Sequence, residues 1–384
     1  MLGALLHRPH AASACGLLIA LALAGCATQT NSAVTVAGTT LTIYAGQPPG
    51  GAGGQAASDV LDAERLALKQ TGTSVGKYTV KLVPLDGKEI SDNARSAVED
   101  KSAIAYLGEL VPGTSQDSVE ITNEVGLLQV SPTDTAAYLT QAVPVVGGSP
   151  TTFYPSRSTY HETFARVVPS SVQEAKAITA EMHALSLTKL YIADDGTAYG
   201  ATTAAEVRSD AASQGLSVVS APAGADTVFY GANTTARATR ALNQAAAASP
   251  TAKLFAPSAL YSDAFAAGLS AAAQKNLYVS SPGYAKGSLN PAGSQFVTAF
   301  QSAYGHAPAP GAIYGYEAMS AVLAVLKQAG ADAGTRSVVV ADFQGLHNRQ
   351  SVLGTYSLSS GDPNLASFVF GRPRGGGLVA TPAG

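Results

Sequence analysis

The feature that most constrains the fold is a regular alternation of short apolar strands with helices in the first third of the chain. The pattern predicts strands at Leu41–Ala45, Lys77–Leu85, Ile104–Gly108 and Gly126–Val130. Between them it predicts helices at Ala57–Leu68, Ser91–Lys101 and Ser115–Glu124. Strands that alternate with helices in this way are typical of a parallel sheet covered by helices on both faces.

The same alternation restarts near residue 170. Helices are predicted at Val172–Leu185, Thr202–Gln214, Thr235–Ala247, Ser262–Ala272, Ser294–Tyr304, Ala312–Gln328 and Ser337–Gln344. Strands are predicted at Lys189–Ala193, Leu216–Ser220, Thr227–Tyr230, Lys253–Ala256, Leu277–Ser280, Gly354–Leu358 and Ala366–Phe370. Two α/β units of similar design indicate two lobes joined by several crossings, with a binding cleft between them.

One connection does not fit the regular pattern. Only Ala221–Asp226 separates the strand predicted at Leu216–Ser220 from the strand predicted at Thr227–Tyr230. Parallel neighbours need a crossover of about a dozen residues or more. We therefore predict that these two strands are not adjacent in the sheet.

Polar loops follow two of the strands in the first unit. The strand at Ile104–Gly108 leads into a loop and a helix start at Thr114–Asp117, and the next strand opens into Ser131–Thr135. In a parallel sheet both loops lie at the carboxyl ends of their strands, where such sheets bind ligands. Hydroxyls and free backbone N–H groups there would form a small polar cradle, although the hydroxyls could equally serve only as helix caps.

Charge and composition exclude several classes of partner. The 384 residues carry 23 basic and 26 acidic side chains, a net charge of −3, and 46% are hydrophobic. Such a chain can bury a large core, and it lacks the basic surface that nucleic acids or anionic membranes attract. We expect no nucleic-acid partner.

The N-terminus has the pattern of a targeting segment. Arg8 precedes an apolar run from Ala11 to Leu23, which is too short to span a bilayer, and the run ends in Leu23-Ala24-Gly25-Cys26. This resembles a bacterial lipobox, and predicts a signal peptide at residues 1–25, a lipid on Cys26 and a tether at residues 26–39. An ordinary secretory signal with a chance cysteine is the alternative. The other cysteine, Cys15, lies in the removed segment, so the mature chain has no thiol chemistry.

Several short motifs resemble known sites without meeting their requirements. The sequence Gly51-x-Gly53-x-x-Ala56, with Asp86 about thirty residues on, mimics a dinucleotide fingerprint at the wrong spacing. We interpret these glycines as a loop lining the cleft. Asp194-Asp195-Gly196 is interpreted as a turn after a strand. The histidines lack ligand spacing and no nucleophile–base set is recognisable, so we expect no cofactor, no metal and no enzymatic activity.

Tyr199-Gly200 lies beyond a strand and before a helix, which would offer the amphipathic ring of Tyr199 to the cleft. This motif is also part of a wider resemblance. From about Thr40 to Phe370 the chain resembles the type I periplasmic substrate-binding proteins of ABC importers, in the branch that binds leucine, isoleucine and valine. The segments that carry the resemblance are Tyr106-Leu107-Gly108, Gly126–Pro132, Ile192–Asp195, Tyr199-Gly200, Val228–Gly231 and Tyr314–Ala318.

The resemblance implies two Rossmann-like lobes with parallel sheets flanked by helices and three hinge crossings. The crossings are expected near Val168-Pro169, Ser281-Pro282 and Gly345–Ser351. Lobe 1 would comprise residues 40–168 and 282–348, and lobe 2 residues 169–281 and 349–373. Residues 374–384 are expected to form a disordered tail.

The resemblance also implies a set of ligand-binding residues. The ligand's carboxylate would be held by the loop Pro112, Gly113, Thr114 and Ser115 and by the segment Thr133, Asp134 and Thr135. From lobe 2, Tyr199 and Asn233 would approach the ligand, and Gln55 and Ser258 complete the expected site.

Two of these positions depart from the family. Pro112 stands where the family has a ligand-binding serine, and it offers neither a hydroxyl nor an N–H group. Ser258 stands where amino-acid binders place a carboxylate for the ligand's ammonium, and a buried ammonium without a carboxylate costs several kcal/mol. Asp134 would also repel a carboxylate if it points inward. We therefore expect a ligand other than a standard branched-chain amino acid.

The sequence thus predicts a monomeric, extracytoplasmic lipoprotein that captures a small polar solute for an ABC permease. The alternative is an interaction or regulatory lipoprotein on the same fold, acting on cell-wall enzymes or a sensor without a transported ligand. An open cleft lined by Thr135, Tyr199 and Asn233 would favour solute capture, and a filled cleft with an apolar outer patch would favour the alternative.

Overall fold

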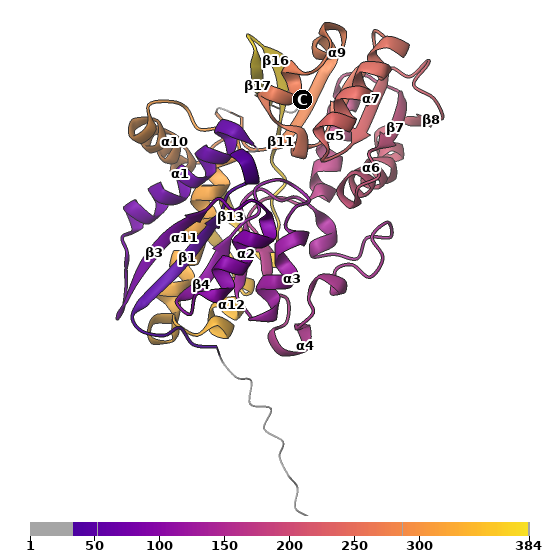
Figure 1. The fold of residues 1–384 in the computed structure, drawn as a ribbon. Coiled ribbons are helices and arrows are strands. Elements are labelled where there is room, and N and C mark those ends of the chain that lie inside the picture. Colours follow the sequence, from indigo (N-terminus) through magenta and orange to yellow (C-terminus); the bar gives the residue numbers. More distant parts are fainter. Residues whose placement is uncertain (1–33, 52, 286, 383–384) are drawn as a thin grey trace, which may run out of the picture. The chain divides into compact units, whose positions relative to one another are not determined.

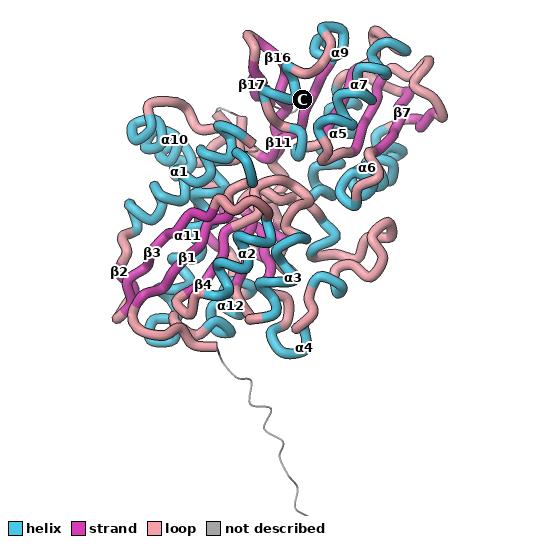
Figure 2. Tube along the Cα trace, viewed as in Figure 1, coloured by secondary structure: helices cyan, strands magenta, loops and turns pink. Residues whose placement is uncertain are grey.

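A computed structural model describes residues 34–51, 53–285 and 287–382, and its strands form two large sheets (Figure 1, Figure 2). The strand order of the first sheet is β2-β3-β1-β4-β5-β6. Its strands are β1 (Thr40–Gly46), β2 (Ser74–Val75), β3 (Tyr78–Leu85), β4 (Ala103–Leu107), β5 (Leu128–Ser131) and β6 (Phe164–Arg166). All neighbours are parallel except the short edge strand β2, which runs antiparallel to β3.

Helices from both ends of the chain cover this first sheet. They are α1 (Gly54–Thr71), α2 (Ile90–Glu99), α3 (Gln116–Glu124), α4 (Arg157–Tyr160), α10 (Pro291–Tyr304), α11 (Ala312–Ala329) and α12 (Arg336–Gln344). Side chains of α1, α10, α11 and α12 share one hydrophobic core with the strands, whereas α2 packs in a second core with Tyr106 and Leu127. We call this unit lobe 1.

The second sheet has the strand order β17-β16-β11-β10-β9-β7-β8. Its strands are β7 (Lys189–Asp194), β8 (Ser217–Val219), β9 (Thr227–Gly231), β10 (Lys253–Ala256), β11 (Leu277–Pro282), β16 (Phe368–Arg374) and β17 (Gly377–Pro382). Its helices are α5 (Ser171–Ala184), α6 (Ala198–Ala211), α7 (Thr235–Ala248), α8 (Asp263–Ala267) and α9 (Ala271–Asn276). We call this unit lobe 2. The predicted fold class, two parallel sheets flanked by helices, is confirmed.

The short connection at Ala221–Asp226 behaves as its length requires. Strand β7 lies between β8 and β9 in the sheet, and each of them pairs with β7 in parallel. The prediction that β8 and β9 are not neighbours is confirmed. The single helix predicted at Ser262–Ala272 is wrong, because the hydroxyl of Ser270 accepts a hydrogen bond from the Ala273 N–H and starts α9 as a separate helix.

The chain passes between the two sheets three times in its described part. The first two passages, between β6 and α5 and after β11, lie close to the predicted positions. The third differs from the prediction at Gly345–Ser351. The hairpin β12 (Arg349–Ser351) and β13 (Gly354–Tyr356) packs into the core of lobe 1 through Val352, Leu353 and Tyr356. A second hairpin, β14 (Leu358–Ser359) and β15 (Asp362–Pro363), follows it, so the chain crosses only before β16.

The second and third crossings are tied to each other. The N–H of Gly283 donates to the Ser367 carbonyl at 3.2 Å, and the Ser367 hydroxyl donates to the Gly283 carbonyl at 2.7 Å. Beyond the third crossing, β17 pairs with β16 over its whole length, so the prediction of a disordered tail at residues 374–384 is wrong for residues up to Pro382.

The predicted signal peptide, Cys26 and the tether as far as Ala33 lie outside the described residues. Among the residues that are described, no helix combines the length and the apolar character needed to cross a membrane.

Candidate functional site

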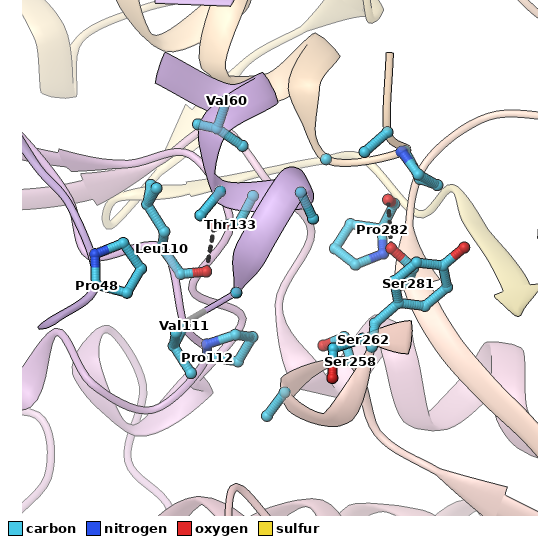
Figure 3. Close-up of a pocket in the computed structure, with 18 of the residues that line it drawn as sticks. Pro48, Val60, Leu110, Val111, Pro112, Thr133, Ser258, Ser262, Ser281 and Pro282 are labelled. Atoms are coloured by element: carbon cyan, nitrogen blue, oxygen red, sulfur yellow. Dashed lines mark hydrogen bonds between the residues drawn. The ribbon is translucent and has the colours of Figure 1, made fainter. Parts of the chain in front are cut away.

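A cavity of about 240 Å³ lies between the two lobes, and we call it the interlobe cavity. Figure 3 shows Pro48, Leu110, Val111 and Pro112 of lobe 1 across the empty space from Ser258, Ser262, Ser281 and Pro282. The remaining lining residues are Gly53, Ala56, Ala57, Val60, Thr133, Asn233, Thr235, Ala259, Tyr261, Ala309, Pro310 and Gly311. Both lobes therefore contribute to the surface of one cavity.

The surface of the interlobe cavity is uncharged. None of the described residues that line it is acidic, basic or a histidine. Most of the lining is aliphatic or proline, and the polar groups are hydroxyls and one amide. The side chains of Asn233, Thr235 and Tyr261 make no hydrogen bond to any other described residue, which leaves an amide and two hydroxyls free to face a guest molecule.

On the lobe 1 side, the interlobe cavity is lined by a loop whose backbone carbonyls accept hydrogen bonds from Ser131 and Thr133. The loop follows β4, and the Thr133 hydroxyl donates to the Leu110 carbonyl at 2.6 Å, as Figure 3 shows. The Ser131 hydroxyl donates to the Glu109 carbonyl at 2.7 Å. The backbone is thus fixed, and it presents Leu110, Val111 and Pro112 to the cavity rather than N–H groups.

The polar cradle predicted at the start of α3 is occupied by the chain itself. Asp134 is fully buried, and its carboxylate accepts hydrogen bonds from the N–H groups of Gly113 at 2.7 Å and Ser115 at 2.8 Å. It also accepts from the Ala136 N–H at 2.9 Å. Asp134 therefore fixes the loop instead of pointing into the cavity. The N–H groups expected to bind an anion from a ligand already bind the carboxylate of Asp134.

Thr135 and Tyr199 meet in a buried cluster beside the interlobe cavity, not on its surface. Both are fully buried, and their hydroxyl oxygens lie 3.1 Å apart across the junction of the two lobes. The Tyr199 ring points toward lobe 1, as expected from the sequence, but it does not line the interlobe cavity. The ring packs with apolar side chains of lobe 1 such as Tyr138 and Val119, because the loop at Gly113 closes over it.

A carboxylate that the sequence reasoning missed lies at the centre of this cluster. Glu174, in the first turn of α5, is buried, and its Oε1 accepts from the Ser258 N–H at 2.6 Å and the Ser280 hydroxyl at 2.5 Å. Its Oε2 accepts from the hydroxyls of Ser258 at 3.1 Å, Thr135 at 3.2 Å and Tyr199 at 3.2 Å. We call this group of five residues the Glu174 cluster. It has one member from lobe 1, Thr135.

The donors of the Glu174 cluster offset part of the desolvation of its carboxyl group. Desolvation raises the pKa of the Glu174 carboxyl above its usual value, and the hydrogen bonds from Ser280, Ser258 and Tyr199 oppose that shift. A carboxylate that accepts this many bonds has no free acceptor position for a ligand.

The sequence carried one signal for Glu174. It lies four residues before Ile178 and eight before Met182, so it shares their face of α5, and both of those side chains are buried. A carboxyl group on the apolar stripe of a helix has to be buried and paired. Its partners could not be read from the sequence, because they lie 25 to 106 residues away.

Some of the expected site residues line the interlobe cavity in the structure and others do not. Pro112, Thr133, Asn233 and Ser258 line the interlobe cavity. Gly113, Thr114, Ser115, Asp134, Thr135 and Tyr199 lie behind or beside it and do not line it. Tyr261, which sequence reasoning also missed, lines it from lobe 2 with Ser262, Ser281 and Pro282. These carry no recognisable motif, so only the fold reveals them.

A larger, outer cavity of about 1020 Å³ adjoins the interlobe cavity. The two share the lining residues Gly53, Ala56, Tyr261, Ser262, Ala309 and Pro310. Gln55 lines this outer cavity, where its amide donates to Asp59 at 2.7 Å. The glycine loop thus lines the cleft as interpreted from the sequence, while Asp86 lines neither cavity. Within the described residues no group of three or more histidine, cysteine or acidic side chains could hold a metal ion.

Comparisons with known proteins agree with this architecture. The family model described as periplasmic binding protein matches residues 47–367. A comparison with curated protein sequences finds no significant match.

Among solved structures, a leucine-binding protein from Thermotoga maritima is similar at 18% identity and a TM-score of 0.71, covering 89% of this chain and 97% of that one. An ABC transporter solute-binding protein from R. palustris in complex with benzoate is similar at 18% identity and a TM-score of 0.67, covering 90% and 96%. A branched-chain amino acid transporter binding protein from Streptococcus pneumoniae with isoleucine is similar at 14% identity and a TM-score of 0.67, covering 89% and 100%. The family match over most of the chain shows that this protein belongs to the periplasmic binding proteins, and its two sheets and three crossings are those of the type I fold.

Proposed function

We propose that this protein captures a small solute in the interlobe cavity and delivers it to the permease of an ABC importer. The observation that carries the proposal is the cavity itself, because residues from both lobes line one space of about 240 Å³. A solute held there contacts both lobes at once, so its binding energy favours the closed arrangement. Membership of the periplasmic binding protein family supports the same role.

The similar leucine-binding protein and the similar structures with isoleucine and benzoate suggest the size of the solute. The space and the mostly aliphatic lining suit a molecule of that size. The free groups of Asn233, Thr235 and Tyr261 would orient it through a few hydrogen bonds.

The test begins with small molecules released from the purified, denatured protein and identified by mass spectrometry. Each candidate is then added to the intact protein in a thermal-shift assay. A solute at a hundred times its dissociation constant adds about 2.7 kcal/mol to the stability, so its true ligand produces a clear upward shift.

A pair of variants ties such a shift to the interlobe cavity. Ala56 lines the cavity from the first turn of α1, so Ala56→Phe should fill part of it and abolish the shift. Ser58→Phe adds the same ring to the same helix at an exposed position that does not line the cavity, and should leave the shift intact. Equal responses of the two variants would place binding elsewhere.

We further propose that Cys26 carries a lipid that anchors the protein at the extracytoplasmic face of a membrane. The support is the sequence Leu23-Ala24-Gly25-Cys26 after an apolar run. In the producing bacterium, radiolabelled palmitate should label the wild-type protein and not Cys26→Ser. A label that survives the substitution would reject the anchor.

One observation favours a second candidate, an interaction or regulatory lipoprotein without a transported ligand. The Glu174 cluster fills the part of the cleft where Thr135 and Tyr199 were expected to meet a ligand. The outer apolar patch that this function requires has no counterpart among the described residues, whose exposed large hydrophobic side chains are Val145, Val218 and Val379 on separate elements. Protein that carries no small molecule and shows no thermal shift would support this candidate.

A further inference from the structure

Two groups of hydrogen-bond donors near the junction of the lobes bind carboxyl groups of the chain itself. Asp134 accepts from the N–H groups of Gly113 and Ser115, and Glu174 accepts from Ser258, Ser280, Thr135 and Tyr199. Gly113, Ser115 and Thr135 are among the residues that the sequence predicts would hold the carboxylate of a guest molecule. No second set of donors with this arrangement lines the interlobe cavity among the described residues.

On this basis we infer that the interlobe cavity takes an uncharged solute, and that Glu174 determines this specificity by excluding carboxylates. The inference rests on the proposed capture of a solute in that cavity. Ser258 connects the interlobe cavity with Glu174, since it lines the cavity and also donates to Glu174 through both its N–H and its hydroxyl. A guest carboxylate that approached Ser258 would therefore meet a carboxyl group that already uses the N–H and hydroxyl donors there.

The same contacts disfavour a cationic solute. A buried ammonium needs a carboxylate with free acceptor positions. In the Glu174 cluster, four residues supply five donor groups to the two carboxyl oxygens. Asp134 likewise accepts from three backbone N–H groups. What remains for a solute is the amide of Asn233 and the hydroxyls of Thr235 and Tyr261, which pair with neutral carbonyl, hydroxyl or amide groups.

The first arm of the test compares solutes of one skeleton with and without charge. Benzamide and benzoate form one pair, and N-acetylleucinamide and leucine form another. Each is added at equal concentration to the wild-type protein in a thermal-shift assay, with sodium chloride as the ionic control. The neutral member of a pair should raise the melting temperature and the charged member should not. A larger shift with leucine or benzoate than with the neutral partner would overturn the inference.

The second arm of the test uses a variant that lacks the Glu174 carboxyl group. In Glu174→Ala the donors of Ser258, Ser280, Thr135 and Tyr199 remain and the carboxylate is gone, so acetate should enter and raise the melting temperature of the variant by several degrees. Acetate should have no such effect on wild-type protein or on Glu174→Gln, whose side chain fills the same space. If Glu174→Ala folds but acetate does not raise its melting temperature, the inference is overturned. If the variant does not fold, the comparison of charged and neutral solutes with wild-type protein tests the inference.

The two arms separate this inference from the proposed function. If the wild-type protein responds to no solute while Glu174→Ala responds to acetate, the exclusion of carboxylates is supported and solute capture is not. If the wild-type protein binds a carboxylate tightly, solute capture is supported and the exclusion of carboxylates is rejected.

Discussion

At the scale of single residues, Gly113 shows how closely the two lobes approach each other. Its backbone has φ +87°, and a Cβ placed there would lie 2.7 Å from the Cβ of Tyr199 and 3.0 Å from Nδ2 of Asn233. Both neighbours belong to lobe 2. The left-handed conformation and the contact across the junction both require glycine.

We predict that Gly113→Ala destabilises the protein more than a substitution with the same backbone strain alone. A non-glycine residue in this conformation costs roughly 1–3 kcal/mol, and the overpacking against Tyr199 adds about 1–3 kcal/mol. Gly196→Ala is the control, because Gly196 has φ +76° and no heavy atom within 4 Å of its added Cβ. Urea unfolding measures the loss of stability of both variants. Equal losses would show that contact with lobe 2 adds nothing to the cost at Gly113.

Glu109 gives a second prediction, for the pH dependence of stability. Burial is the largest cause that raises the pKa of its carboxyl from 4.5 to about 7, although the hydrogen bond from the Tyr106 hydroxyl at 2.6 Å opposes the shift. Between these two values the folded protein holds a proton that the unfolded chain has released. The free energy of unfolding that depends on this group therefore falls as the pH rises through that window.

We expect Glu109→Gln to remove this part of the pH dependence. A shift of this size corresponds to on the order of 3 kcal/mol, and the amide can keep the bond from Tyr106 through its carbonyl oxygen. Denaturant unfolding at pH 4.5 and pH 7.5 should show wild-type protein losing stability relative to the variant at the higher pH. Glu99→Gln, at an exposed position, serves as the control and should follow wild type.

At the scale of secondary-structure elements, Arg166 connects three segments of lobe 1. It extends from β6, is fully buried, and donates to the carbonyls of Asp134 at 2.8 Å and Ala136 at 2.7 Å. Its Nε forms an ion pair with Asp362 of the hairpin β14–β15 at 2.9 Å. This arginine therefore holds the Thr133–Ala136 loop and the hairpin on the same strand.

Arg166→Met should cost about 3–5 kcal/mol, because it removes the charge that pairs with Asp362 and the guanidinium donors to two buried carbonyls. Arg157→Met removes an ion pair with Glu162 in which both side chains are exposed, and should cost no more than about 1 kcal/mol. Chemical denaturation of the two variants gives the comparison. A loss at Arg166 as small as that at Arg157 would mean that the loop and the hairpin are held by other contacts.

At the scale of the whole molecule, Thr135 is the point where lobe 1 joins the Glu174 cluster. Its hydroxyl contacts Glu174, Tyr199 and Ser258, all of which belong to lobe 2. The apolar packing of Tyr199 against lobe 1 lies next to this contact. Separation of the lobes must break both.

We predict that Thr135→Val, which keeps the shape and removes the hydroxyl, shifts the ligand-free protein toward open arrangements. Small-angle X-ray scattering should give a larger radius of gyration, and amides at the start of α6 should exchange faster with solvent. Thr122→Val removes an equally buried hydroxyl that bonds to Gln129 within lobe 1, so it should lower stability without opening the lobes. Identical scattering from both variants would show that Thr135 does not hold the lobes together.

The sequence by itself determined the order of the strands and helices and the parallel pairing that follows from it. These depend on local periodicity and connection length, as the separation of β8 from β9 by β7 illustrates. It also placed the glycine loop before α1 at the cleft, and Pro112, Thr133, Asn233 and Ser258 at the interlobe cavity.

Only the tertiary structure decided how the polar groups are used. A hydroxyl can donate to a ligand, a backbone carbonyl or a distant carboxylate, and nothing local selects among them. The partners of Glu174 come from segments as far away as Ser280. Val352 and Tyr356 pack in the core of lobe 1 with side chains that are distant in the sequence. Contacts of this kind form only when remote segments meet, so they fix the chemistry of the cleft without leaving a pattern in the sequence.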